Sequence, residues 1–277
     1  MRVLRAHHIT KLVAVVDSFL PREGVNPRGG RPVILHTNET IGLLLFSSFV
    51  APQRTIRGVY TWAQTYYYRR FHLPSYKSFV RKCHQALAGM LVILDQLLVR
   101  DARIRFMDST MLHVCKLVRA NRHKVAKAVA GFGKNWQGWH YGLKLHAACN
   151  ARGQLAAVYF TAANAHDGQQ IPHLVNGATV IAVGDGTYNA SVMRRKMWRE
   201  HYAHILSPPH PTQRKKVLAR WQLSLLRARP RIECVFDYLK EQPPLTELVP
   251  SLSGRLRRPL CSNPAGLPVD VGVLRLR

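Results

Sequence analysis

Acidic residues are scarce in this chain. Its 277 residues include only 14 Asp and Glu against 41 Lys and Arg, which gives a formal net charge of +27. So large an excess of one charge opposes compactness through self-repulsion, and it is typical of proteins that bind polyanions. We therefore expect a nucleic acid as partner, bound through counterion release at its phosphates.

Paired cysteines and long apolar runs are also missing. Five Cys are scattered without a C-x-x-C pair, which argues against a structural zinc site and fits a reducing compartment. The most apolar window, residues 86–99, is too short for a membrane span and carries Asp95. The chain opens without a signal-peptide pattern. These absences predict a cytoplasmic, nucleoid-associated protein with no membrane partner.

The first hundred residues favour helices. Apolar residues recur at helical spacing, most clearly after Pro74, and a cluster of aromatic and cationic residues lies at 62–71. That cluster fits either a helix packed by its rings or a surface that contacts nucleic acid. We expect residues 1–100 to form a helical N-terminal DNA-binding region. Its expected helices cover 9–20, 40–50, 57–71 and 75–98.

From residue 103 the pattern changes to strands alternating with helices. This order predicts an α/β domain with a mixed sheet flanked by helices over residues 101–241. A turn at 150–153 joins two segments that we expect to pair as an antiparallel hairpin. The expected strands are 103–108, 139–150, 154–161, 179–184 and 204–207, and the expected helices are 167–176 (closed by Gly177), 189–201, 212–226 and one that starts at Pro230.

Three of the few acids occupy positions that suit a metal site. Asp108 ends one apolar run, Asp185 ends another, and Glu233 lies on the helix that starts at Pro230. Carboxylates gathered at one edge of a sheet can hold Mg²⁺, which prefers oxygen ligands. Taken singly, each Asp is equally well read as an N-cap or turn residue. We expect the three acids to converge within metal-bridging distance.

Several segments, in order, carry a family resemblance. They are Phe106 to Thr110, Gly138 to His146, Thr161 to Asp167, Gly184 to Tyr188 and Arg229 to Lys240. The second contains the pattern Gly-x-Lys-x-His, and the last keeps Arg, Glu and Lys at fixed intervals. In this set the chain resembles the DDE transposases of bacterial insertion sequences. It departs from them in having Gly186-Thr187 after the second Asp and Leu226 where a Tyr is common.

The resemblance implies an RNase H-like catalytic core with assigned roles. Asp108, Asp185 and Glu233 would be the catalytic residues and the ligands of Mg²⁺, with Mn²⁺ as a substitute. Arg229, Lys240 and Lys144 would contact DNA. The implied partners are the terminal inverted repeats of the element and target DNA, bound by a homo-oligomer. The implied function is strand cleavage at the element ends followed by strand transfer.

Alternatives stay open for the activity, for Asp167 and for the tail. The core also suits a nuclease that does not join strands, or an inactive DNA-binding remnant of a transposase. Asp167 starts an expected helix, where the dipole favours an acid, and its other interpretation is a supporting role near the site. Residues 242–277 form a basic tail rich in Pro, Gly and Arg. It fits either a disordered natural arm or a frameshifted reading frame.

Overall fold

A computed structural model gives the fold of residues 6–21, 33–50, 55–122, 126–135, 138–210, 212–213 and 217–241. These residues belong to two compact units that divide between Leu97 and Leu98. Each unit is described by itself. The predicted tail at 242–277 lies outside the described residues, and so does the Gly/Pro/Arg-rich segment at 23–32, which the sequence predicts to be a loop.

The first unit consists of helices. They are α1 (Ala6–Phe19), α2 (Thr37–Val50), α3 (Ile56–Tyr67) and α4 (Tyr76–Leu97). Their apolar faces meet in a core that includes Ile9, Leu43, Val59 and Phe79, all buried. The four predicted helices are thus confirmed, with ends that differ by a few residues. Thr55 caps α3 by accepting the Gly58 N–H, which satisfies a donor left free at the helix start.

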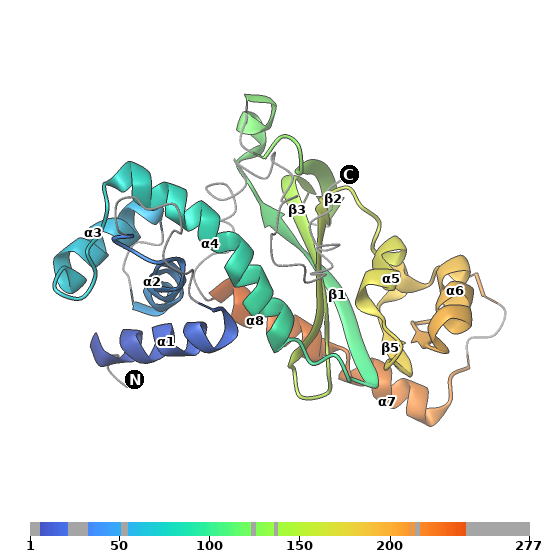
Figure 1. The fold of residues 1–277 in the computed structure, drawn as a ribbon. Coiled ribbons are helices and arrows are strands. Elements are labelled where there is room, and N and C mark those ends of the chain that lie inside the picture. Colours follow the sequence, from blue (N-terminus) through green and yellow to red (C-terminus); the bar gives the residue numbers. More distant parts are fainter. Residues whose placement is uncertain are drawn as a thin grey trace. The chain divides into compact units, whose positions relative to one another are not determined.

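The second unit is built on a six-stranded mixed sheet (Figure 1). Its central strand β1 pairs antiparallel with β3 and parallel with β5, and β5 pairs parallel with β6. Strands β2 and β4 both pair with β3, on the edge away from β1. The strands are β1 (Ile104–His113), β2 (Gly131–Asn135), β3 (Gly138–Cys149), β4 (Leu155–Ala162), β5 (Ile181–Val183) and β6 (His204–Leu206).

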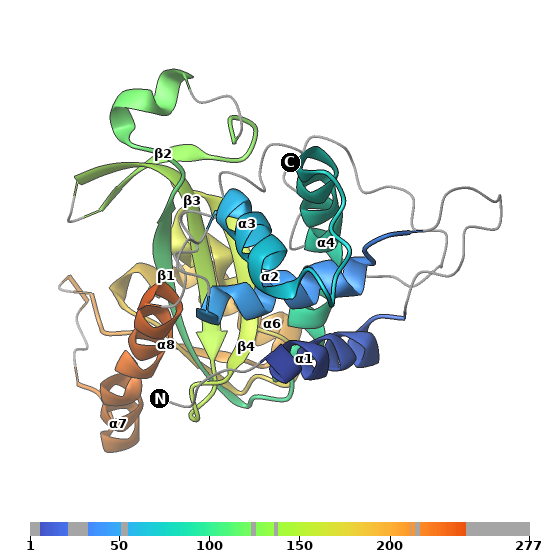
Figure 2. The ribbon, with the colours of Figure 1, turned by 90° about the vertical axis from the view of Figure 1, so that its left-hand side faces the viewer.

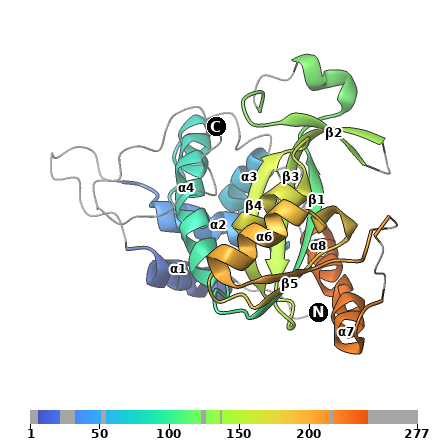
Figure 3. The ribbon, with the colours of Figure 1, turned by 90° about the vertical axis from the view of Figure 1, so that its right-hand side faces the viewer.

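Helices cover both faces of this sheet. In Figure 1, α5 (Ile171–Leu174) and α6 (Ser191–His201) lie on one side of β1, and α8 (Pro230–Glu241) lies on the other. Figure 3 shows α6 in front of the sheet, and Figure 2 shows α7 (Arg220–Ala228) followed by α8 beside β1. The α5–α6 face is apolar, with Met107, Ala148 and Ile171 buried in one cluster. This arrangement is consistent with an RNase H-like fold and confirms the predicted fold class.

Two predicted helices are shorter than expected. The segment from Asp167 forms a 3₁₀ turn, η2 (Asp167–Gln170), followed by the single turn of α5, and Gly177 does not close it. The helix ends earlier because Val175 already has extended backbone angles. The basic helix expected at 212–226 begins only at Arg220, where the Gln222 side chain accepts the Ala219 N–H. Residues 214–216 of that segment lie outside the described part.

Two strand features were not predicted. Strand β1 continues to His113, because the polar residues after Asp108 still pair with β3. Asp108 therefore lies within the strand, and the prediction that it ends the strand was wrong. Strand β2 is glycine-rich and has little intrinsic β preference. Close packing accounts for one glycine, since a Cβ at Gly133 would lie 2.4 Å from the Ala163 carbonyl oxygen.

Candidate active site

Asp108 and Asp185 lie just beyond the paired stretch of two neighbouring parallel strands. The pairing of β1 with β5 ends at Phe106 and Val183, and each Asp lies two residues beyond that pair. Parallel strands present their carboxyl ends at one edge of a sheet, so the register brings the two acids to the same edge. Asp185 is also the N-cap of the 3₁₀ turn η3 (Gly186–Tyr188), where its Oδ1 accepts the Thr187 N–H at 2.9 Å.

Arg229 links Asp108 to Glu233. Its guanidinium donates to Asp108 Oδ2 at 3.2 Å and, through its other terminal nitrogen, to Glu233 Oε1. Arg229 directly precedes α8, and Glu233 lies one turn further along on the same side. We call Asp108, Arg229 and Glu233 the Asp108 cluster. The side chains of Asp108 and Arg229 are 19% and 22% exposed and that of Glu233 is 47% exposed, so the cluster opens to solvent through Glu233.

Burial dominates the electrostatics of Asp108. Loss of solvent raises the pKa of its carboxyl group from 3.8 to about 6. The Ser109 N–H and the Arg229 cation oppose this shift, and the negative charges of Asp185 and Glu233 add to it. The three acids therefore act on one another electrostatically, and one guanidinium does not neutralise them all.

A second polar cluster lies on the other face of the sheet. Asp167 Oδ1 accepts from Ser109 Oγ and from Lys144 Nζ, each at 3.0 Å, and lies 3.6 Å from His146 Nδ1. Lys144 also donates to the Ala165 carbonyl, so its ammonium is held by two partners. We call Ser109, Lys144, His146 and Asp167 the Asp167 cluster. The sequence left two interpretations of Asp167 open, a helix-terminal acid and a supporting role near the site. The structure places it beside Lys144 and His146, which lie two apart on one face of β3.

His146 is fully buried in this second cluster. Burial is the main cause that lowers the pKa of its imidazole to about 4, and it outweighs the raising effect of Asp167. Its Nε2 lies 2.8 Å from Thr161 Oγ1 on β4. The imidazole is therefore neutral near pH 7. The cluster then carries one negative and one positive charge, which balance.

The Asp108 cluster and Asp185 fit a divalent cation in chemistry but are not assembled around one. Three carboxylates with a net negative charge and a raised carboxyl pKa are the donor set that Mg²⁺ prefers. Within the described residues, however, no three His, Cys, Asp or Glu side chains lie close enough to hold one ion together. The structure thus brings Asp108 and Glu233 onto one guanidinium and leaves Asp185 turned toward Thr187.

The three residues predicted to contact DNA lie in different settings. Arg229 is engaged by two carboxylates, and Lys144 is 12% exposed and engaged by Asp167. Lys240 is exposed near the end of α8, seven residues after Glu233. Of these, Lys240 presents its charge most openly to solvent. None of the helices in the described part of the chain is long and apolar enough to span a membrane.

The topology of the sheet and the acids at one end of it define an RNase H-like core with a candidate phosphoryl-transfer site. A family model described as "Transposase DDE domain" matches residues 99–246. The chain belongs to this family. Membership implies a phosphoryl-transfer enzyme that binds DNA, and DDE transposases generally use divalent metal ions. No curated protein and no solved structure matches the chain.

Proposed function

We propose that the protein is the transposase of an insertion sequence. It binds the terminal inverted repeats as a homo-oligomer, cleaves a strand to free a 3′-OH, and joins that hydroxyl to target DNA. The observation that carries the proposal is the Asp108 cluster, in which two of the three family acids share one guanidinium at the edge where Asp185 also lies. Residues 1–100 are the proposed recognition region for the element ends.

Each site residue has a role that follows from its setting. Asp108, Asp185 and Glu233 are the proposed ligands of Mg²⁺, or of Mn²⁺ as a substitute. Such ions, when bound, activate the attacking oxygen and stabilise the leaving one. Burial and the two neighbouring acids hold the pKa of Asp108 at about 6 even with Arg229 beside it, so further positive charge favours its ionised form. Arg229 is also placed to grip a phosphate when it leaves the carboxylates.

Lys240 and Lys144 complete the proposed DNA contacts. Lys240 lies two turns along α8 from Glu233 and on the same face, so it can hold a phosphate next to the acids. Lys144 can do so only if it exchanges Asp167 for a phosphate. We therefore expect Lys240→Ala to reduce cleavage more selectively than a change at Lys144, which also disturbs the fold.

The test is Mg²⁺-dependent nicking of a labelled DNA fragment taken from the repeats that flank the gene. Asp108→Asn, Asp185→Asn and Glu233→Gln should each lower cleavage by at least ~1,000-fold, because each removes a charge that offsets a cation. A gel-shift assay should show DNA binding retained. Asp237→Asn is the matched control, since Asp237 is an exposed acid one turn beyond Glu233 on α8.

The outcomes separate the candidate functions. Full cleavage by the Glu233→Gln protein contradicts the three-acid mechanism. Cleavage without joining to a second duplex supports a nuclease on the same core. If the unaltered protein binds the fragment and never cuts it, the remnant interpretation is favoured, and the tail at 242–277 is the first segment to replace.

A further inference from the structure

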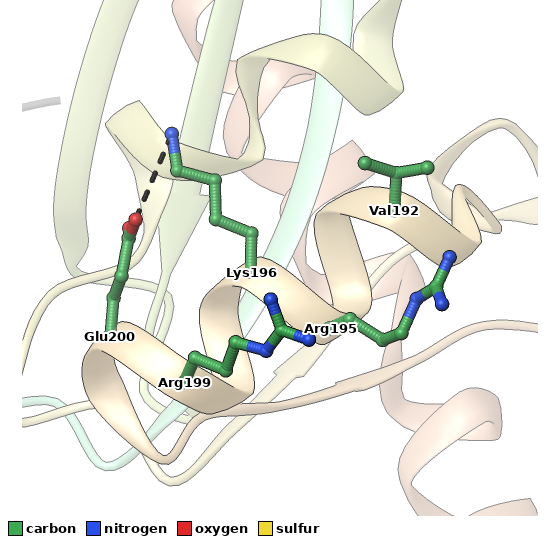
Figure 4. Close-up of a pocket in the computed structure, with 5 residues that line it drawn as sticks. All are labelled: Val192, Arg195, Lys196, Arg199 and Glu200. Atoms are coloured by element: carbon green, nitrogen blue, oxygen red, sulfur yellow. Dashed lines mark ion pairs between the residues drawn. The ribbon is translucent and has the colours of Figure 1, made fainter.

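Helix α6 presents a cationic face to solvent. Arg195 and Arg199 are both exposed and lie one turn apart, about 6 Å along the axis. Figure 4 shows them on the same side of the helix as Val192. The one acid of α6, Glu200, pairs with Lys196 at 3.9 Å instead. Like charges one turn apart disfavour a helix, so this face costs stability unless a polyanion covers it.

Two exposed aromatic rings continue this face. Trp198 and Tyr202 are 56% and 75% exposed, and their ring centroids lie 6.0 Å apart. Trp198 follows Arg195 by three residues on α6, and Tyr202 caps the helix one turn after Trp198. Large rings left in water are unfavourable, and rings beside arginines are the pattern of sites that bind unpaired bases.

Backbone strain at Tyr202 points the same way. Tyr202 ends α6 in the left-handed region, with φ 53°, and its N–H bonds to the carbonyls of Met197 and Trp198. Glycine adopts this conformation at lower cost than tyrosine. The cap hydrogen bonds are compatible with glycine at this position as well, and only the edge-on contact of the ring with Trp198 requires the tyrosine. A tyrosine kept in this conformation with its ring exposed is found at functional positions.

We propose that Arg195, Trp198, Arg199 and Tyr202 form a binding surface for single-stranded DNA. The guanidiniums bind successive phosphates, and the two rings stack on bases. Duplex DNA hides the faces of its bases, so exposed rings favour a single strand. The proposal rests on the proposed function only in taking DNA as the partner.

The first test measures binding without metal. Full-length protein is titrated into a labelled oligothymidine strand and into a duplex of equal length, with EDTA present, and anisotropy is recorded at several salt concentrations. Arg195→Gln/Arg199→Gln should weaken single-strand binding about tenfold near 0.15 M salt and lower the salt slope by about 1.4. The matched control is Arg103→Gln/Arg152→Gln, which removes the same charge from exposed positions near the start of β1. It should change the affinity less than twofold.

The second test addresses the rings. Trp198→Ala should weaken single-strand binding about fivefold or more and duplex binding less than twofold, since stacking needs an unpaired base. Tyr202→Gly should raise the melting temperature by relieving the left-handed tyrosine, and it should weaken single-strand binding at the same time. A residue with a purely structural role would not combine a higher melting temperature with weaker single-strand binding when it is replaced.

Three results would overturn the proposal. They are equal losses for the α6 pair and the control pair, unchanged single-strand affinity in Trp198→Ala, and equal losses of duplex and single-strand binding in that variant. Because the assay contains EDTA, it is independent of cleavage. A protein that never nicks DNA can still show the α6 pattern, and a protein that nicks normally can still lack it.

Discussion

The two polar clusters lie on opposite faces of one sheet, and neighbouring residues of β1 contribute one side chain to each. Asp108 joins the cluster on the α8 face, and Ser109 joins the one on the α5 face. In the Asp167 cluster one carboxylate meets one ammonium, a hydroxyl and a neutral imidazole, so the charges balance. In the Asp108 cluster two carboxylates share one cation while a third acid adds its field.

The difference teaches how structure and chemistry are divided in this domain. A cluster whose charges balance stabilises the fold and has no excess charge with which to hold a further ion. A cluster with excess negative charge is costly until a further cation arrives, which is the condition of a metal site before loading. We therefore expect changes in the Asp167 cluster to affect stability most, and changes in the Asp108 cluster to affect catalysis most.

The largest expected effect on stability comes from breaking the pair of Lys144 and Asp167. Lys144→Met leaves the Asp167 carboxylate with only a hydroxyl and a neutral imidazole, at 17% side-chain exposure. Removing one partner of a buried ion pair typically costs about 3–5 kcal/mol, and the partial exposure places this pair at the lower end. Urea unfolding of the full chain measures the loss. A loss below about 1 kcal/mol would show that the Asp167 cluster does not stabilise the fold.

A smaller effect on the free energy of unfolding is expected from a change of pH, and it has opposite signs in the two clusters. The raised pKa of Asp108 means that the folded chain holds this proton more tightly, so its contribution to stability is lost as the pH rises from about 4 to 6. The lowered pKa of His146 means that the unfolded chain holds that proton more tightly, so its contribution is lost as the pH falls from 6.5 to about 4. The two slopes oppose each other in the unaltered protein.

Replacing either Asp108 or His146 should reveal the pH dependence of stability that the other residue causes. The change in pKa from 3.8 to about 6 at Asp108, and that from 6.5 to about 4 at His146, each correspond to about 3 kcal/mol. Between pH 4 and 6.5 we expect Asp108→Asn to gain stability as the pH rises, relative to the unaltered protein, and His146→Gln to lose it. Urea unfolding across this range, with EDTA present, measures both. Slopes that match the unaltered protein in both variants would mean that the two groups titrate as they do in the unfolded chain.

Much of the fold followed from the sequence, because local patterns control it. Helices with an apolar stripe and the hairpin around residues 150–153 are specified by periodicity and turn residues. Strand β2 was missed because tertiary pairing with β3 overrides its weak propensity. The composition of the residues after 212 predicted a helix there. Helix α7 nevertheless starts only at Arg220, where the Gln222 side chain accepts the Ala219 N–H.

The site was predictable in its residues and not in its contacts. The family segments single out Asp108, Asp185 and Glu233, and their role stays a prediction. That Arg229 lies between two of them depends on how α8 packs across β1, which no local pattern determines. The Asp167 cluster depends likewise on the register of β1 with β3, which pairs Ser109 with His146. A shift of that register by one residue would have placed Ser109 on the opposite face.

The smallest expected change in the free energy of unfolding comes from Glu233, the most exposed member of the Asp108 cluster. The side chain of Glu233 is nearly half exposed in its ion pair with Arg229, and exposed pairs contribute about 0–1 kcal/mol. The order along the helix, cation before acid, is the less favourable one for such a pair. Glu233→Gln should therefore change the free energy of unfolding by less than about 0.5 kcal/mol in EDTA, measured by urea unfolding beside Asp237→Asn. A loss as large as that of Lys144→Met would place Glu233 among the residues that hold the fold together. A near-zero loss with cleavage abolished would show that the cluster on the α8 face serves chemistry alone.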